Sequence, residues 1–113
     1  MKLDRDQRQE ARRIAAELAQ IARSGEVLPG SLAERRMRCG QPGCACQRDP
    51  TRRHGPYWQW TRKVKNKTVG RFVAKEEAVE CRRWIANDRR LRELVARLEA
   101  IGIECLEAER RGD

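Results

Sequence analysis

The sequence lacks any run of about 18 apolar residues, and this absence excludes a membrane-spanning helix. The first residues, Met1–Asp6, also lack the apolar stretch of a secretory signal, so we expect a cytoplasmic protein with no membrane partner. Hydrophobic residues make up 39% of the 113 residues and charged residues 38%, against about 25% charged residues in an ordinary domain. So little apolar material predicts a thin core and long, exposed helices.

Acidic residues are scarce in the middle of the chain. Residues 31–75 contain twelve lysines and arginines but only two acids, Glu34 and Asp49, which gives this segment a net charge of +10. The segments before and after it carry only +1 and −2. A segment this basic, with so few balancing acids, favours a polyanionic partner such as DNA or RNA.

The usual signatures of catalysis are also missing. Two acids in unrelated places are too few for a metal-dependent nuclease, and no glycine-rich phosphate-binding motif occurs. A Ser/His/Asp triad would have to use the only histidine, His54. We therefore expect a protein that is not an enzyme, although cysteine spacing alone does not reveal whether a thiol is catalytic.

Two segments have the apolar period of an amphipathic helix, and they divide the chain into residues 1–26, 27–75 and 76–113. The first helix is predicted from Asp4 to Arg23, with Asp4 or Asp6 as its N-cap and Gly25 at its end. From Lys75 onward a second helix of about 35 residues carries a heptad seam. The seam residues are Trp84, Asn87, Leu91, Leu94, Leu98, Ile101 and Cys105. The first helix has a matching stripe at Ala11, Ile14, Leu18 and Ile21.

The matching stripes predict either a helical hairpin within one chain or a dimeric bundle in which both stripes share a core. Two matching stripes in one small chain favour the hairpin, whereas the length of the second helix favours a homodimer. Between the helices, strands are predicted at Leu32–Arg38, Tyr57–Val64 and Thr68–Ala74, with a hairpin turn at Asn66–Lys67. The predicted fold class is therefore α+β: a small zinc-stapled antiparallel β-hairpin or three-stranded module, flanked by two helices.

A Cys/His motif lies inside the basic segment. Cys39, Cys44, Cys46 and His54 have the spacing C-x4-C-x-C-x7-H, and three thiolates with one imidazole satisfy a tetrahedral Zn²⁺ ion. Thiols stay reduced in the cytosol, which favours a metal over disulfides. Such a site would be structural, since protein atoms fill every position. Two alternatives remain: Cys81 in place of His54 as the fourth ligand, or ordinary reduced cysteines with His54 on the surface.

Basic and aromatic side chains surround this motif. Arginine grips phosphate with two hydrogen bonds and lysine adds charge, while flat rings can stack on unpaired bases. Trp58 and Trp60 share one face of their strand, and at least one of them is expected to pack in the core, whereas Tyr57 lies on the other face. The candidate nucleic-acid contacts are Arg35, Arg36, Arg38, Arg48, Arg52, Arg53, Tyr57, Arg62, Lys63, Lys65, Lys67 and Arg71.

Three motifs together give a resemblance to a known family. Residues 28–32 (LPGSL), 38–46 (RCGQPGCAC) and 54–58 (HGPYW) resemble those of small bacterial, archaeal and phage proteins grouped as a domain of unknown function (DUF6788-like). The resemblance covers about residues 27–106. It implies that Cys39, Cys44, Cys46 and His54 are the signature set, and that the protein is associated with mobile genetic elements.

The leading hypothesis is a zinc-stapled nucleic-acid binder, an accessory factor of a mobile element or an RNA-guided system, with a protein of that complex as a further partner. The alternative is a protein-interaction adaptor whose helices assemble a complex and whose basic module docks on an acidic partner.

Overall fold

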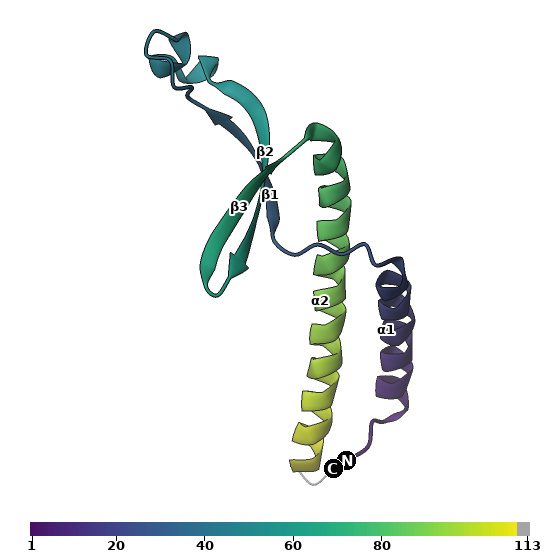
Figure 1. Cartoon of the computed structure of the whole chain (residues 1–113). Coiled ribbons are helices and arrows are strands. Elements are labelled where there is room, and N and C mark those ends of the chain that lie inside the picture. The colour runs from purple at the N-terminus through teal and green to yellow at the C-terminus, as the bar shows by residue number, and fades with distance from the viewer. Residues whose placement is uncertain (111–113) are drawn as a thin grey trace. The chain divides into compact units, whose positions relative to one another are not determined.

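The computed structural model describes residues 1–110 and contains two helices and a three-stranded antiparallel sheet, which confirms the predicted α+β class. Residues 111–113, the end of the predicted 76–113 segment, lie outside the described residues. The elements are α1 (Arg5–Ser24), β1 (Ser31–Met37), η1 (Ala45–Gln47), η2 (Pro50–Arg52), β2 (His54–Val64), β3 (Lys67–Val73) and α2 (Lys75–Arg110) (Figure 1). The chain divides into two compact units: residues 1–28 with the part of α2 from Ala86 onward, and residues 29–85. None of the helices in residues 1–110 has an apolar stretch that could cross a membrane.

The ends of α1 are set by local sequence. Asp4 is its N-cap: the Asp4 carboxylate accepts a hydrogen bond from the Gln7 amide at 2.8 Å, and the Gln7 side chain accepts one from the Asp4 amide at 2.9 Å. Gly25 ends the helix in the left-handed conformation, with φ at 66°. Both features agree with the prediction from the sequence, which left Asp4 and Asp6 as alternative caps.

In the first unit, α1 lies alongside the C-terminal part of α2 (Figure 1). Ile14, Leu94 and Ile101 form the core between them, with 6%, 4% and 1% of their surface exposed. Partly buried residues surround this core: Leu3, Leu18, Ile21 and Leu98. The two apolar stripes thus pack on each other within one chain as a helical hairpin, while the homodimer stays a prediction.

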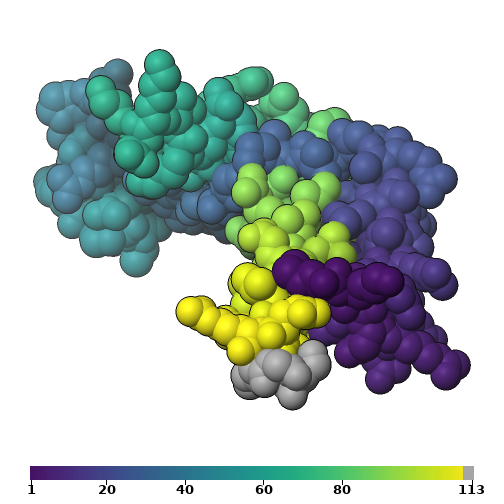
Figure 2. Space-filling model, turned by 90° about the horizontal axis from the view of Figure 1, so that it is seen from below, coloured from purple at the N-terminus to yellow at the C-terminus, as the bar shows by residue number. Residues whose placement is uncertain are grey.

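Polar contacts flank this core. Arg90 on α2 donates two hydrogen bonds to the Glu17 carboxylate of α1, at 2.6 and 2.9 Å. Arg97 donates two hydrogen bonds to the Glu10 carboxylate at the same two distances. At the start of the chain, the Met1 amino group lies 3.5 Å from Glu109. Figure 2 shows the N-terminal residues, in purple, against the end of α2, in yellow. The helices are therefore held in register by charge as well as by apolar packing.

The polar member of the seam, Asn87, has a different partner. Its amide donates a hydrogen bond to the backbone carbonyl of Glu26 at 2.9 Å, just after α1 has ended. Asn87 thus satisfies a carbonyl where the chain leaves the helix, so a polar residue in the seam does not require a second copy of the chain.

In the second unit, the sheet has the order β1-β2-β3. The predicted turn at Asn66–Lys67 is wrong by one residue. The two residues of the turn are Lys65 and Asn66, with φ at 50° and 67°, and Lys67 already pairs with Val64. Two consecutive positive φ angles are typical of the tight hairpin turn whose twist matches that of the strands. Pairing also carries β2 back to His54, three residues before the predicted start, because His54 lies opposite Met37 on β1.

The two faces of the sheet differ. Trp58 and Trp60 share a face with Arg71, since cross-strand partners point to the same side. On this face the guanidinium of Arg82 from α2 lies 4.8 Å from the Trp58 ring centre, and the Trp60 indole donates to the Pro29 carbonyl at 2.7 Å. The tryptophans therefore have partners inside the unit and are half-buried.

Candidate metal centre and basic surface

The ends of β1 and β2 and the loop between them bring four metal-ligating side chains together. Cys39 follows β1, Cys44 and Cys46 lie at the short helical turn η1, and His54 is the first residue of β2. Gly55 makes this arrangement sterically feasible, because its φ is 131° and a Cβ atom there would lie 2.8 Å from the Arg35 carbonyl oxygen. The close approach falls where the register of β1 shifts between Arg35 and Met37.

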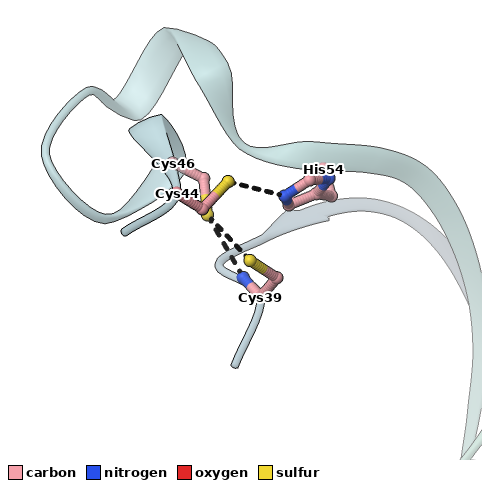
Figure 3. A group of neighbouring side chains, drawn as sticks. All are labelled: Cys39, Cys44, Cys46 and His54. Carbon is pink, nitrogen blue, oxygen red and sulfur yellow. Dashed lines mark hydrogen bonds between the residues drawn. The ribbon is translucent and has the colours of Figure 1, made fainter. Parts of the chain in front are cut away.

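The four donor atoms have the spacing of a single metal site. The sulfurs of Cys39 and Cys46 lie 3.5 Å apart, and Cys44 Sγ lies 3.3 Å from His54 Nε2 (Figure 3). All four atoms lie within 4.8 Å of one another. Around a tetrahedral zinc ion with Zn–S of about 2.3 Å and Zn–N of about 2.0 Å, neighbouring donors are about 3.5 to 3.8 Å apart. The residues therefore fit one tetrahedral ion and form a Cys3His cluster able to bind a metal.

The two remaining cysteines lie elsewhere. Within residues 1–110, Cys81 is not part of the cluster, so the fourth donor in the structure is His54. Cys105 is buried in the seam of α2, and its thiol donates to the Lys2 carbonyl at 3.3 Å.

Neighbouring groups orient the sulfurs. The Cys39 amide donates to Cys46 Sγ at 3.3 Å, while the Cys39 carbonyl accepts a hydrogen bond from the Gln47 side chain. The Cys44 amide donates to the Gln41 carbonyl at 3.1 Å and closes a tight turn. Gln47 was not identified from the sequence. Its position in the chain gives no sign that its side chain hydrogen-bonds to the backbone of Cys39 and so orients that cysteine.

Hydrogen bonding separates the acidities of two thiols. The Cys46 amide, followed by His54 and the other sulfurs, lowers the pKa of Cys44 to about 6 by stabilising its thiolate. The Cys39 amide acts in the same direction on Cys46, but burial and the two neighbouring thiols outweigh it and raise the pKa of Cys46. Metal binding needs the thiolate form, so an ion must supply the charge that favours deprotonation of Cys46. A tetrahedral ion held by these four donors would have every coordination position filled by a protein atom.

The predicted cationic contacts are almost all on the surface. Arg53 is half-buried, and its Nε atom is buried with no hydrogen-bond partner. The remaining ten residues are exposed, and together we call them the basic surface: Arg35, Arg36, Arg38, Arg48, Arg52, Arg62, Lys63, Lys65, Lys67 and Arg71.

Few carboxylates neutralise the basic surface. Arg36 lies 3.9 Å from Glu34, Arg71 lies 3.6 Å from Glu77, and Arg62 lies over the Trp60 ring at 5.3 Å. The other members form no salt bridge in the part of the chain that the structure describes. The basic surface thus leaves most of its cations available to a partner.

Tyr57 has an aromatic neighbour that the sequence analysis did not connect with it. The rings of Tyr57 and Phe72 meet edge to face, with centres 6.1 Å apart and an angle of 64° between their planes. The strand register indicates this contact, because Phe72 pairs with Gln59, and Gln59 shares a face of β2 with Tyr57. Sequence reasoning treated Phe72 only as a strand residue.

Comparison with protein-family models gives one match. A domain of unknown function (DUF6788) matches residues 3–83, which include α1, the whole sheet and the Cys3His cluster. The resemblance was expected over about residues 27–106, but the match begins well before residue 27 and ends well before residue 106. The shared domain therefore includes α1, and the part of α2 after residue 83 lies outside the match. No curated protein and no solved structure matches the chain. Because the matched region spans most of its length, the chain belongs to the DUF6788 family.

Proposed function

We propose that this protein is a non-enzymatic nucleic-acid-binding protein whose binding module is held together by a structural zinc ion. The observation that carries the proposal is the basic surface, which gathers ten exposed arginines and lysines on one small unit with few carboxylates beside them. When such cations bind the phosphates of a nucleic acid, the counterions condensed on those phosphates are released, and this release favours binding.

Zinc follows from the chemistry of the donors and from what the loop lacks. Three sulfurs and one imidazole are the ligands that zinc favours in structural sites. Within residues 38–53, Cys46 is the only residue that is buried, so the loop has no apolar core of its own. A metal ion would replace that missing core and fix the positions of the nearby arginines.

The proposal leaves no role for catalysis in the cluster, since its donors would saturate the ion. The family resemblance adds a biological setting, an accessory factor of a mobile element or RNA-guided system. Such a factor needs affinity for nucleic acid more than catalytic turnover, and the basic surface would supply this affinity.

A salt titration tests the proposal. Fluorescence anisotropy would follow the binding of labelled random-sequence DNA and RNA from low to high salt. We expect the logarithm of the binding constant to fall linearly with the logarithm of salt concentration, by about 0.7 to 0.9 for each phosphate contacted. Arg52→Glu should weaken binding to all sequences alike and lower the steepness of that line by about one.

Arg89→Glu is the matched control, because Arg89 is also exposed but lies on α2 outside the basic surface. It changes the net charge equally and should leave the titration nearly unchanged. Failure of the wild-type protein to bind DNA or RNA at low salt would overturn the proposal and leave the adaptor that docks on an acidic protein.

A further inference from the structure

The chain contains one tyrosine and one phenylalanine, and the sheet places them side by side in solvent. Tyr57 on β2 is 43% exposed and Phe72 on β3 is 50% exposed. Both are on the face of the sheet opposite Trp58, whose face is the one in contact with α2. Large exposed rings that touch each other form an apolar patch, and such patches on otherwise polar surfaces mark binding sites.

The rings are part of a wider surface on the face of the sheet opposite Trp58 and its partner Arg82. We call it the open face; its residues come from all three strands and include Arg35, Tyr57, Gln59, Thr61, Lys63, Thr68 and Phe72. The only acid in the three strands, Glu34, pairs with Trp58 and therefore lies on the other face. The open face thus combines two rings and two cations, and it has no carboxylate.

A shallow depression lies at the hairpin end of the sheet. Its volume is about 180 Å³, and it is lined by Gly30, Ser31, Thr61, Arg62, Lys63 and Thr68. Three of these residues carry hydroxyls, and Thr61, Lys63 and Thr68 belong to the open face, whereas Arg62 lies on the opposite face. Hydroxyls and a lysine are the groups that contact phosphate and sugar in nucleic-acid complexes. Tyr57 and Thr61 are four residues apart on one strand, or about 13 Å. The depression and the rings can therefore contact one strand of nucleic acid at the same time.

Gln59 lies between the two ends. Its side-chain amide crosses Gly70, where a Cβ atom would approach Gln59 Nε2 to 2.7 Å. The absence of a side chain at Gly70 thus leaves room for the amide at this position of β3, two residues before Phe72, which pairs with Gln59. An amide in this place can donate to and accept from the edge of a base.

We propose that the open face binds single-stranded nucleic acid, with unpaired bases stacked on Tyr57 and Phe72 and the backbone running toward Lys63 and the hydroxyl-lined depression. This inference rests on the proposed function and names its substrate class. Stacking requires the flat face of a base, and in a duplex that face is covered by neighbouring base pairs. A sheet with exposed rings therefore favours single strands, whereas a protruding helix or ribbon would suit the grooves of a duplex.

The test compares single strands with a duplex. Dissociation constants would be measured by anisotropy at low salt for labelled oligouridine, oligothymidine and a blunt DNA duplex of the same length. Phe72→Ala and Tyr57→Ala should each weaken binding of both single strands about 5- to 100-fold. Binding of the duplex should change less than about twofold, since phosphate contacts from the basic surface remain.

Two variants serve as controls, one for the loss of an exposed apolar side chain and one for the loss of the tyrosine hydroxyl. Val69→Ala removes an apolar side chain that is 45% exposed on the same strand but on the opposite face, so it should bind like the wild type. Tyr57→Phe keeps the ring and should retain most of the affinity. Circular dichroism would verify that every variant folds.

The outcomes separate the two proposals. If the wild type binds nucleic acid with the expected salt dependence but Phe72→Ala behaves like Val69→Ala, the open face is not the site and only this inference fails. Equal loss of single-strand and duplex binding on ring truncation would also overturn it. No binding of any probe would refute the proposed function and this inference together.

Discussion

His54 lies opposite Met37 in the pairing of β1 with β2, and its Nε2 atom lies 3.3 Å from Cys44 Sγ. One donor of the Cys3His cluster is thus fixed by strand register, while the three sulfurs come from the end of β1 and the turns that follow it. The cluster therefore joins the sheet to a loop that has no buried apolar residue except Cys46. Loss of the metal should disorder the loop more than the sheet.

The first prediction concerns the fourth ligand. His54→Ala should lower zinc affinity by more than about 100-fold, since even groups that only orient a ligand contribute about 10- to 100-fold. His54→Cys should keep one zinc per chain, because four thiolates also form a structural site. Native mass spectrometry of the purified proteins would count the bound metal.

Cys81→Ser is the control for this experiment, because Cys81 is a cysteine of the same chain outside the cluster. It should bind one zinc like the wild type. A wild-type protein that is fully folded without metal, with unchanged proton chemical shifts after chelation, would contradict the role given to the cluster.

The second prediction concerns the core of the helical unit. Ile101 is 1% exposed and packs with Ile14 and Leu94. Ile101→Ala should lower the free energy of unfolding by about 2 to 5 kcal/mol, because it removes buried methyl groups and leaves a cavity. Urea denaturation followed by circular dichroism would measure the change.

Ile103 offers a matched comparison two residues along the same helix. It is 60% exposed, so Ile103→Ala should change the free energy of unfolding by no more than about 0.5 kcal/mol. Similar losses for the two variants would mean that α2 does not present the heptad seam to α1.

Residue patterns predict the helices well. Apolar spacing identifies the stripe through Ile14 and the seam through Leu94 and Ile101, since core contacts along a helix repeat every three or four residues. The cluster was also within reach, because the four donors lie close in sequence and a tight loop can bring them together. Residue spacing alone left Cys81 as an alternative to His54 for the fourth ligand, because spacing does not show where α2 places Cys81 relative to the three cysteines of the cluster.

Contacts between strands were harder to foresee. The contact between Tyr57 and Phe72 depends on the register of β2 and β3. The predicted turn was one residue too late, and a slip of one residue in the register moves every side chain of a strand to the other face. The partner of Asn87 was similarly hidden, because the Glu26 carbonyl belongs to a loop 61 residues away. Such features depend on tertiary packing and leave no local pattern.

The third prediction concerns pH. The hydrogen bonds from Arg97 hold the pKa of Glu10 below its ordinary value of 4.5, despite the opposing effect of desolvation. A carboxyl whose pKa is lowered by folding contributes stability above its unfolded pKa, and this contribution is lost as the pH falls through the folded value. Glu10→Gln should therefore lower Tm by a few degrees at pH 7 and have a smaller effect well below pH 4, where Glu10 is protonated in both states.

Glu99→Gln serves as the control, because Glu99 is an exposed residue of α2 with no ion pair in the described structure. It should not alter the dependence of Tm on pH. Salt should reduce the effect at Glu10, since the pair lies at the surface. An effect of Glu10→Gln that is the same at pH 7 and at low pH would show that the carboxylate charge does not stabilise the helix pair.

The last prediction contrasts two glycines, one that the fold requires and one that it does not. Gly55 has φ at 131° and leaves no room for a Cβ atom beside the Arg35 carbonyl, so Gly55→Ala should cost about 1 to 3 kcal/mol of strain. Gly102 lies inside α2 with nothing within 4 Å of a Cβ atom, so Gly102→Ala should stabilise the protein by up to about 1 kcal/mol. Because Gly55 adjoins His54, its substitution should also weaken zinc binding, whereas Gly102→Ala should leave it unchanged. Denaturation and metal titration of both variants would check this. Equal metal affinity in the two would mean that the close approach of β2 to β1 at Gly55 does not position the histidine.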